Sequence, residues 1–287
     1  MNKTRERIGE IIFLLSAVLS VLLIFLIIFF IFSEGIKFVR DYGLLPFLTG
    51  TKWKPTASNP YFGIFPMIIA SIIVTFLSTL IALPFGLGTS IFMAYYAKKS
   101  YSSLKALINL MAAIPSVVYG FFAMMVLVPI IKSLFGLRSG MTMLTASILL
   151  ATMILPTMVN ISENSLRKVP ITFYQGSLAL GASKEETIQK VMLPYAKSGI
   201  FSSIILAIGR AIGETMAVYL VVGNQPRLPG SILTGARTLT TNIVLEMGYA
   251  SGLHRQALIA TAMVLFFFIL LINIIFNIIR YKNEKKF

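Results

Sequence analysis

The stretch IIFLLSAVLSVLLIFLIIFFIFS, which occupies residues 11–33, contains no charged side chain. A hydrocarbon core about 30 Å thick requires roughly 20 apolar residues in one helical span, so this stretch is long enough to cross a membrane. It exceeds the roughly 7 to 15 residues of a signal peptide's apolar segment, and no small-x-small cleavage site follows it. We therefore expect it to remain in the chain as a first transmembrane helix.

Five further apolar runs follow, in a chain of 287 residues that is 57% hydrophobic and only 12% charged. Soluble domains have about 25% charged residues, so most of this chain is expected in lipid. The run at residues 60–97 is too long for one upright helix, and Pro84 with Gly86 and Gly88 predicts a break there, with a span before it and a short interfacial helix after it. We predict an all-α membrane protein with six transmembrane helices. The remaining runs lie at residues 106–131, 139–162, 198–222 and 256–279.

The distribution of lysine and arginine predicts that both termini are cytoplasmic. In this N-in, C-in arrangement fifteen cations lie in cytoplasmic segments and nine in outer segments, as the positive-inside rule requires. The formal net charge of +15 also raises nucleic-acid binding, but the cations are scattered over short segments without a continuous basic stripe. We therefore expect membrane lipid and no nucleic acid as surroundings. The predicted parts are an N-terminal helix with its outer loop (1–60), a core of five transmembrane helices with the cytoplasmic segment 163–197 (61–280), and a basic cytoplasmic tail (281–287).

The residues that an enzyme would require are scarce. His254 is the only histidine, Asp41 is the only aspartate, cysteine is absent, and the glycines form no phosphate cradle. We therefore predict that the chain is not itself an enzyme and holds no metal or cofactor. His254, beside Arg255, is interpreted as a solvated or interfacial loop residue without a role in function.

The largest predicted cytoplasmic segment, residues 163–197, has the signals of two short helices. Gly181 suits the left-handed position that ends the first helix, and Ser183 with Glu186 forms a capping box that opens the second. Prolines mark the outer limits of the pair, with Pro170 at its start and Leu193–Pro194 at its end. Spacing alone leaves two interpretations open: an amphipathic surface loop, or a rigid handle that a partner grips.

The charged residues Arg210 and Glu214 interrupt the apolar run at residues 198–222. Four residues apart, they would share one face of a helix, and Arg210 would lie about 15 Å from either end of the span. A charge at that depth costs about 2.5–3.5 kcal/mol on insertion scales, so neither side chain is expected to face lipid. They form either an ion pair that holds helices together or part of a substrate path.

Residues 175–194, QGSLALGASKEETIQKVMLP, resemble the "EAA" loop of ABC-importer permeases. That loop begins with Glu-Ala-Ala, continues to a glycine and ends ten residues later in an aliphatic-x-Leu-Pro sequence. The Glu-Ala-Ala is replaced here, while the signals of the helix–turn–helix are kept. The resemblance implies a MetI-like importer permease fold. It also implies that ATPase coupling uses Gln175, Gly176, Ser177, Gly181, Ala182, Leu193 and Pro194.

Three more stretches resemble the PstC family of phosphate-specific permeases: IPSVVYGFF at residues 114–122, RAIGETMAV at residues 210–218, and the loop at residues 223–258. The resemblance covers nearly the whole chain. It implies a subunit of an ATP-driven importer of inorganic phosphate in the inner membrane. The implied partners are a PstA-type permease subunit, a dimer of PstB-type ATPases beneath it and a PstS-type phosphate receptor outside.

Physical reasoning on the path residues agrees with that resemblance. An inside-negative potential opposes anion entry by about 2.3 kcal/mol per charge per 100 mV, and this chain has no ATP site of its own. Arg210 can meet phosphate oxygens with a bidentate fork, with Thr215 as a nearby hydroxyl donor. Glu214 would hold Arg210 in place and neutralise it when the path is empty.

Two rival interpretations remain open at this point. An ABC permease for another oxyanion would share the cytoplasmic loop and differ in the anion that stimulates ATP hydrolysis. A channel or membrane enzyme would be active as this chain alone, without an ATPase or a receptor.

Overall fold

The computed structural model describes residues 3–284, and this part of the chain is predominantly helical. The predicted number of spans is confirmed, because six helices in the described part are long and apolar enough to cross a membrane. These six helices are Gly9–Tyr42, Phe65–Tyr95, Ser116–Leu134, Met143–Arg167, Lys184–Gly213 and Gly252–Ile278.

The elements follow one another along the chain with short connections. In order they are α1 (Lys3–Tyr42), α2 (Leu44–Thr49), β1 (Trp53–Lys54), β2 (Tyr61–Phe62), α3 (Phe65–Tyr95), α4 (Tyr101–Ala113), α5 (Ser116–Phe122), the π-helical turn η1 (Ala123–Leu127), α6 (Val128–Leu134), α7 (Met143–Arg167), α8 (Ile171–Ala179), α9 (Lys184–Thr187), the π-helical turn η2 (Ile188–Met192), α10 (Leu193–Gly213), α11 (Met216–Val221), α12 (Leu239–Met247) and α13 (Gly252–Glu284).

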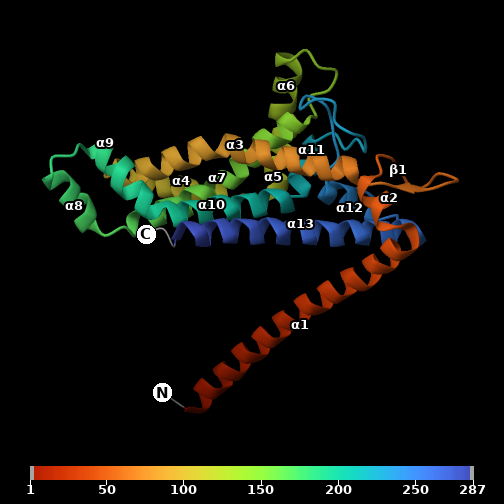
Figure 1. Cartoon of the computed structure of the whole chain (residues 1–287), viewed down its shortest axis with the longest axis horizontal. Coiled ribbons are helices and arrows are strands. Elements are labelled where there is room, and N and C mark those ends of the chain that lie inside the picture. The colour runs from red at the N-terminus through yellow and green to blue at the C-terminus, as the bar shows by residue number, and fades with distance from the viewer. Residues whose placement is uncertain (1–2, 285–287) are drawn as a thin grey trace.

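Helix α7 is the centre of a bundle in which α3, α7, α10 and α13 run side by side (Figure 1). Its N-terminus is capped by Thr142, whose side chain accepts a hydrogen bond from the amide of Thr145. Small residues line the face toward α3, and Ser147 donates to the carbonyl of Val74 at 3.4 Å. Small side chains let membrane helices approach closely, where packing replaces the hydrophobic effect as the stabilising force.

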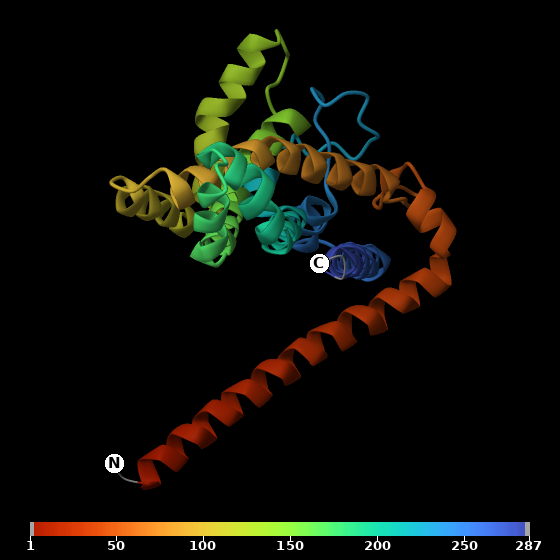
Figure 2. The same cartoon turned by 60° about the vertical axis from the view of Figure 1, so that its left-hand side comes forward.

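Helix α1 leaves this bundle and extends away from it over most of its length (Figures 1 and 2). It contacts α13 near its C-terminal end, where the ring of Phe32 meets Phe266 and Phe267 in edge contacts. Gly35 fits tightly there, because a Cβ on it would lie 3.0 Å from the sulfur of Met263. The rest of the helix is apolar and exposed, so it requires lipid or another subunit as its neighbour.

A small cap closes the end of the bundle that the charge distribution assigns to the outside. The antiparallel strands β1 and β2 pair Trp53 with Phe62, and both rings are buried. They pack with Phe38 and Phe47 in one apolar cluster. The cap therefore joins the outer ends of α1, α2 and α13.

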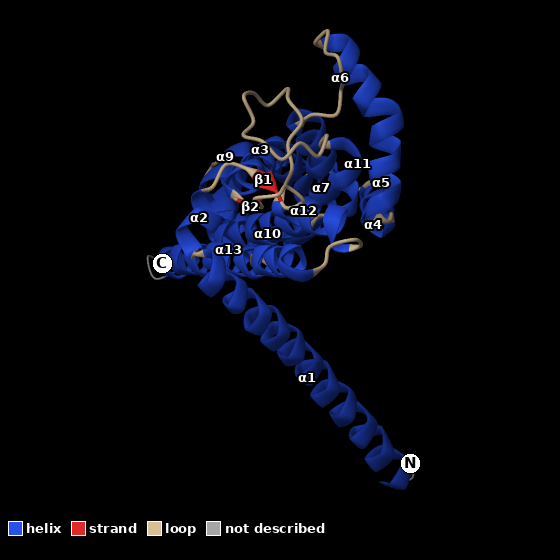
Figure 3. Cartoon of the chain, turned by 90° about the vertical axis from the view of Figure 1, so that its right-hand side faces the viewer, coloured by secondary structure: helices blue, strands red, loops and turns tan. Residues whose placement is uncertain are grey.

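Two predicted features of the spans are wrong. Helix α3 continues through Pro84 without the predicted break, because Gly86 is used for close packing, where a Cβ would lie 3.2 Å from Cβ of Met158. A proline in a membrane helix is tolerated when neighbouring groups satisfy the backbone that it frees. The run at residues 106–131 is not one span, since α4 ends before Pro115. The segment from α5 to α6 then leaves the bundle at a steep angle (Figure 3).

In Figure 1 the C-terminal end of α13 lies toward the end of the bundle that carries α8 and α9, and the N-terminal end of α1 points to the same side of the picture but lies away from the bundle. This arrangement agrees with the predicted placement of the termini on the side of the large cytoplasmic segment. Of the predicted basic tail, residues 281–284 belong to α13, and residues 285–287 lie outside the described residues.

Candidate functional site

The helix that carries Arg210 is broken three residues after it. Helix α10 ends at Gly213, the backbone of Glu214 is extended (φ −67°, ψ 132°), and α11 begins at Met216. The predicted continuous span over residues 200–222 is therefore wrong. Broken helices expose backbone groups, which membrane proteins tolerate only where protein or a water-filled cavity surrounds them.

The depth of Arg210 follows from its contact with α7. Its Nη1 donates to the hydroxyl of Thr157 at 3.1 Å. Thr157 lies about 21 Å from the start of α7 and about 15 Å from its end, at 1.5 Å per residue. Arg210 therefore lies near mid-membrane, as predicted, and its side chain is exposed on the surface of this chain.

The predicted ion pair between Arg210 and Glu214 is not formed. Within residues 3–284 the ion pairs involve other residues, because the helix ends between these two and they no longer share a face. Glu214 instead accepts a hydrogen bond from the amide of Ala217 at 3.3 Å, at the start of α11. A carboxylate is favourable at that end of a helix. Arg210 is thus a cation without a bound carboxylate at mid-membrane.

The two sequence stretches singled out above meet at this break. A Cβ on Gly120 would lie 2.9 Å from Cα of Ala217, so α5 packs directly on α11. Thr215 donates to the carbonyl of Gly213 at 3.1 Å, and its hydroxyl is thereby held at the break rather than beside Arg210. The structure therefore joins Arg210, Glu214 and Thr215 to one irregular segment, with each side chain bonded to a different partner.

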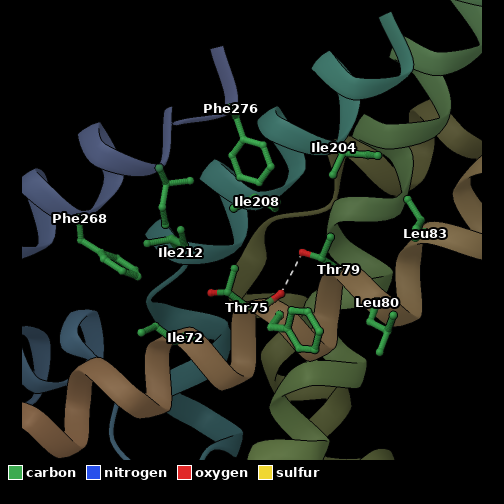
Figure 4. A pocket seen from close by; sticks show the side chains of 12 residues that line it. Ile72, Thr75, Thr79, Leu80, Leu83, Ile204, Ile208, Ile212, Phe268 and Phe276 are labelled. Carbon is green, nitrogen blue, oxygen red and sulfur yellow. Dashed lines mark hydrogen bonds between the residues drawn. The ribbon is translucent and has the colours of Figure 1, made fainter. Parts of the chain in front are cut away.

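An apolar cavity of about 350 Å³ lies beside this segment, between α3, α10 and α13 (Figure 4). Its walls carry side chains such as Ile72, Ile208 and Phe268. The hydroxyl of Thr79 is turned to the carbonyl of Thr75 at 2.9 Å and is already satisfied. An anion would lose its hydration there without receiving donors, so this cavity is unsuitable for an oxyanion.

The cytoplasmic helix pair is formed by α8 and α9. Gly181 adopts the predicted left-handed conformation with φ 88°. The predicted capping box is also present: the Glu186 amide donates to the Ser183 hydroxyl at 3.2 Å, and the Ser183 amide donates to the Glu186 carboxylate at 3.1 Å. The hydroxyls of Ser177 and Thr187 lie 2.9 Å apart and join the two helices. These contacts give the pair a defined shape.

The second helix of the pair does not end at Leu193 and Pro194, as the sequence suggested. It passes through η2 into α10, so that Lys184–Gly213 is one helix of 30 residues. Pro194 lies directly after the π-helical turn η2, where the regular helical hydrogen-bond pattern is already interrupted. Because the second helix of the pair is continuous with α10, a movement of the helix pair can displace the helix break that lies beside Arg210.

Helix α8 has no buried residue, and exposed apolar side chains lie near its start and directly after its end. Leu180, which follows it, is 91% exposed, and Ile171 and Phe173 are exposed as well. Gln175 and Gly176 lie on the same exposed helix, and Ala182 follows the turn, where its amide donates to the carbonyl of Ser177. Leu180 was not among the predicted coupling residues. Its place directly before the turn glycine Gly181 is the sequence feature that could have indicated an exposed apolar contact residue.

Lysine and tyrosine side chains attach this pair to α3. Lys184 donates to the carbonyl of Tyr95 at 3.0 Å and lies 3.6 Å from the centre of the Tyr96 ring. The Tyr96 hydroxyl donates to Glu185 at 3.1 Å. Desolvation and the Glu185 carboxylate raise the pKa of the Tyr96 phenol, so it stays a donor at neutral pH.

A buried carboxylate fixes α7 next to the same region. Glu163 is fully buried, and it pairs with Lys105 of α4 at 2.8 Å and with Arg167 one turn along α7. The Tyr101 hydroxyl donates to it at 3.1 Å. Two cations and a phenol compensate the buried negative charge of Glu163. The cluster therefore connects α4 to α7 by charged contacts.

The interpretation of His254 as a solvated loop residue is wrong. It lies in the first turn of α13, is 9% exposed, and its Nε2 is 2.8 Å from Glu246. Glu246 is buried too, in α12, and also pairs with Arg237. Sequence alone left the depth of Glu246 open, because its partners come from separate segments of the chain.

Comparisons with known proteins agree with this architecture. The model of the family described as "Binding-protein-dependent transport system inner membrane component" matches residues 86–287. A "Probable ABC transporter permease protein YqgH" of Bacillus subtilis is 40% identical, over 83% of this chain and 81% of its own. A "Phosphate transport system permease protein PstC" of Pasteurella multocida is 32% identical, over 84% and 81%.

Solved structures show the same fold at low sequence identity. The MetNI methionine ABC transporter in an inward-facing conformation aligns with a TM-score of 0.63 at 19% identity, over 77% of this chain and 95% of that one. A bacterial ABC transporter for import of the acidic polysaccharide alginate aligns with a TM-score of 0.63 at 13% identity, over 98% and 99%.

Proposed function

The chain belongs to the family of binding-protein-dependent transport system inner membrane components, and we propose that it moves inorganic phosphate as one permease subunit of an ATP-driven importer. As a member of that family it is a permease subunit of an ABC transporter and a multi-pass protein of the inner membrane. The proposal concerns its substrate, its path residues and its particular partners.

The exposed guanidinium of Arg210 at mid-membrane is the observation that carries the proposal. Its bond to Thr157 uses one of its five N–H donors, which leaves the others available for an oxyanion. A guanidinium binds phosphate oxygens in a bidentate fork and stays charged in the membrane. A cation that faced lipid at this depth would cost about 2.5–3.5 kcal/mol, so the exposed side of Arg210 belongs to a polar path or a second subunit.

Glu214 and Thr215 are proposed to line the same path at the helix break. An anion that reaches Arg210 meets the carboxylate of Glu214 close by in the chain, which limits how tightly the site holds it. Moderate affinity suits transport, since binding must be weak enough for release. Relatives named as phosphate permeases support phosphate as the anion.

The cytoplasmic helix pair is proposed as the site where an ATPase binds. Its exposed apolar side chains, Phe173 near the start of α8 and Leu180 directly after its end, offer anchors of the kind that fill pockets on a partner. The coupling residues proposed from the sequence are Gln175, Gly176, Ser177, Gly181, Ala182, Leu193 and Pro194. The continuous helix from Lys184 to Gly213 would carry the motion of the ATPase to the break.

We further propose a PstA-type permease subunit beside this chain, a PstB-type ATPase dimer below it and a PstS-type phosphate receptor outside. Family membership implies an ATPase and a substrate-binding protein in general terms. The exposed α1 and α6 are available for the second permease subunit.

Receptor-dependent ATP hydrolysis by the assembled transporter tests the substrate. The complex is reconstituted in proteoliposomes, and hydrolysis and uptake are compared with phosphate, arsenate, sulfate and molybdate, each supplied with receptor. We expect phosphate to give stimulation and uptake that sulfate and molybdate do not. Stimulation by another anion in place of phosphate would assign the chain to a different oxyanion, and would leave its role as a permease intact.

A further inference from the structure

Helix α12 carries a buried face in the outer half of the protein, and most of the residues on that face are polar. Its buried residues include Thr240, Thr241, Asn242 and Glu246. Buried polar side chains stabilise a protein only when their hydrogen bonds are satisfied. The partners of these side chains show which elements α12 holds together.

Glu246 joins three other segments at the outer end of α12. One carboxylate oxygen accepts from Nε1 of Trp53 in β1 at 2.9 Å and lies 2.8 Å from Nε2 of His254 in α13. The other oxygen pairs with Arg237, in the segment that leads into α12. The hairpin, α12 and α13 are therefore tied to a single carboxylate.

Arg237 extends this network to the outer end of α11. Its Nε donates to the carbonyl of Asn224 at 3.1 Å, just beyond α11, and the adjacent Ala236 amide donates to Val222 at 2.9 Å. Arg237 also donates to the side chain of Asn242 at 3.1 Å. The last residues of the α11 segment are thus held by the chain that forms α12.

Thr240 holds the inner end of the same unit. Its hydroxyl donates to the backbone carbonyl of Glu214 at 3.0 Å, inside the helix break. One residue earlier, the amide of Leu239 donates to the Ser71 hydroxyl of α3 at 3.0 Å. Thr240 and Glu246 are separated by about 9 Å of continuous helix, at 1.5 Å per residue.

We propose that Thr240 and Glu246 are positioning residues for Glu214, through which α11, α12 and the outer hairpin move as one body against α10 when the path opens. This inference rests on the proposed transport function and adds to it the residues that set the position of the break. Helix α11 is held at both ends by α12 and its leading segment. The joint between α10 and this body is therefore the link from Gly213, the last residue of α10, to Glu214, whose carbonyl is bonded to α12.

Two hydrogen bonds, from Thr240 to Glu214 and between His254 and Glu246, are expected to transmit the motion. Loss of the Thr240 hydroxyl frees the carbonyl of Glu214 from α12 and removes a 3.0 Å contact with the hydroxyl of Thr238 at the N-cap of α12, while the bonds of Glu246 stay intact. Loss of the His254 bond weakens the outer end while the break stays tied. Since both bonds belong to α12, either loss should weaken the connection between the outer cap and Glu214.

The test uses the complete transporter with its receptor and ATPase in proteoliposomes. Thr240→Val removes the hydroxyl at nearly constant shape, Thr240→Ser keeps it, and His254→Phe keeps the ring contacts while removing the bond to Glu246. Thr261→Val is the matched control, because Thr261 is buried and its hydroxyl bonds only within its own helix, to Ala257. Anion uptake, basal ATP hydrolysis, anion moved per ATP and thermal stability are measured.

We expect Thr240→Val to lower the maximal uptake rate roughly 2- to 10-fold, the range of one hydrogen bond. The half-saturating receptor concentration and basal hydrolysis should stay unchanged, so that less anion moves per ATP. The melting temperature should fall no further than that of Thr261→Val, which also loses one buried hydrogen bond. Thr240→Ser should behave as the wild type, and Thr261→Val should show wild-type uptake. The double variant of Thr240→Val with His254→Phe should lose no more than the worse single variant, since both break one connection.

Three results would overturn the inference. The first is wild-type uptake by Thr240→Val, and the second is a loss that Thr240→Ser shares and that parallels a loss of assembled complex. The third is a multiplicative loss in the double variant. The identity of the anion is read from the wild type alone, before any variant is measured. If the wild type moves an anion other than phosphate, the variants are tested with that anion, so the two proposals fail separately.

Discussion

Replacement of Arg210 by glutamine is expected to abolish uptake without weakening the protein. Within the chain, the guanidinium makes one hydrogen bond, to Thr157 at 3.1 Å, and its loss costs about 1 kcal/mol. Removal of the charge relieves part of the cost of a cation at mid-membrane, about 2.5–3.5 kcal/mol, namely the part that the polar path does not already offset. The sum of these two free-energy changes favours the variant. Arg210→Gln should therefore insert into the membrane as well as the wild type and have a melting temperature at least as high.

The expected effect of Arg210→Gln on phosphate uptake is a loss, and in free energy it is larger than the expected effect on stability. A charge-assisted hydrogen bond contributes about 1.5–3 kcal/mol, and a bidentate fork supplies two of them. Loss of the fork should therefore lower uptake by at least about 100-fold, at 1.36 kcal/mol per factor of ten. Arg210→Lys keeps the charge without the fork and should be intermediate. Thr157→Val removes only the internal bond and should retain most of the uptake.

The assay is uptake of labelled phosphate by proteoliposomes that contain the whole transporter, with melting temperatures measured in detergent on the same preparations. The reasoning is refuted if Arg210→Gln takes up phosphate within about threefold of the wild type, less than one charged hydrogen bond is worth. Failure of Arg210→Gln to insert or assemble would equally refute it, because Arg210 would then serve the fold.

Four further predictions address the coupling helices, a buried charge and the topology. Leu180→Asp should weaken ATPase binding at least about 10-fold in co-purification while permease stability is unchanged, since the side chain is 91% exposed; Leu180→Met should bind normally. Gly181→Val should strain the left-handed turn by about 1–2 kcal/mol and reduce ATPase association. Gly181→Asn should reduce association less, because asparagine tolerates the left-handed conformation. Equal ATPase binding by the two variants would contradict the proposed role of the turn. Glu163→Gln should lower stability by about 3 kcal/mol, seen as a lower melting temperature, because it leaves Lys105 and Arg167 facing a buried site without their carboxylate. A cysteine at position 186 should react with an impermeant thiol reagent in inverted vesicles only, and labelling of intact cells would reverse the topology.

Features that depend on neighbours in sequence were predictable. The capping box of Ser183 and Glu186 and the left-handed turn at Gly181 are local arrangements, because each requires only residues within one helical turn. The six spans were predictable for a similar reason, since the length of each apolar run is set by bilayer thickness alone. The mid-membrane depth of Arg210 followed from its position in such a run.

Features that depend on distant neighbours were not predictable. The break after Gly213 is not marked by a proline, and the freed carbonyl of Glu214 is satisfied by Thr240, 26 residues later. The burial of His254 depends on Trp53 and Glu246, which belong to two other elements. Conversely, Pro84 is a local signal for a break that the packing of Gly86 against α7 overrides. Tertiary contacts decide these cases, and single-sequence reasoning has no access to them.

The helix break also determines which substitutions can separate a transport role of Arg210 from a structural one. An exchange of Arg210 and Glu214 would keep an ion pair only if both residues lay on one continuous helix, and they do not. The exchange would place a carboxylate beside Thr157 and a guanidinium at the start of α11, next to the amide of Ala217, where a cation opposes the helix dipole. Loss of uptake by the exchanged protein would then have two causes of similar size. Arg210→Gln avoids this ambiguity, because its structural effect and its functional effect are expected to have opposite signs.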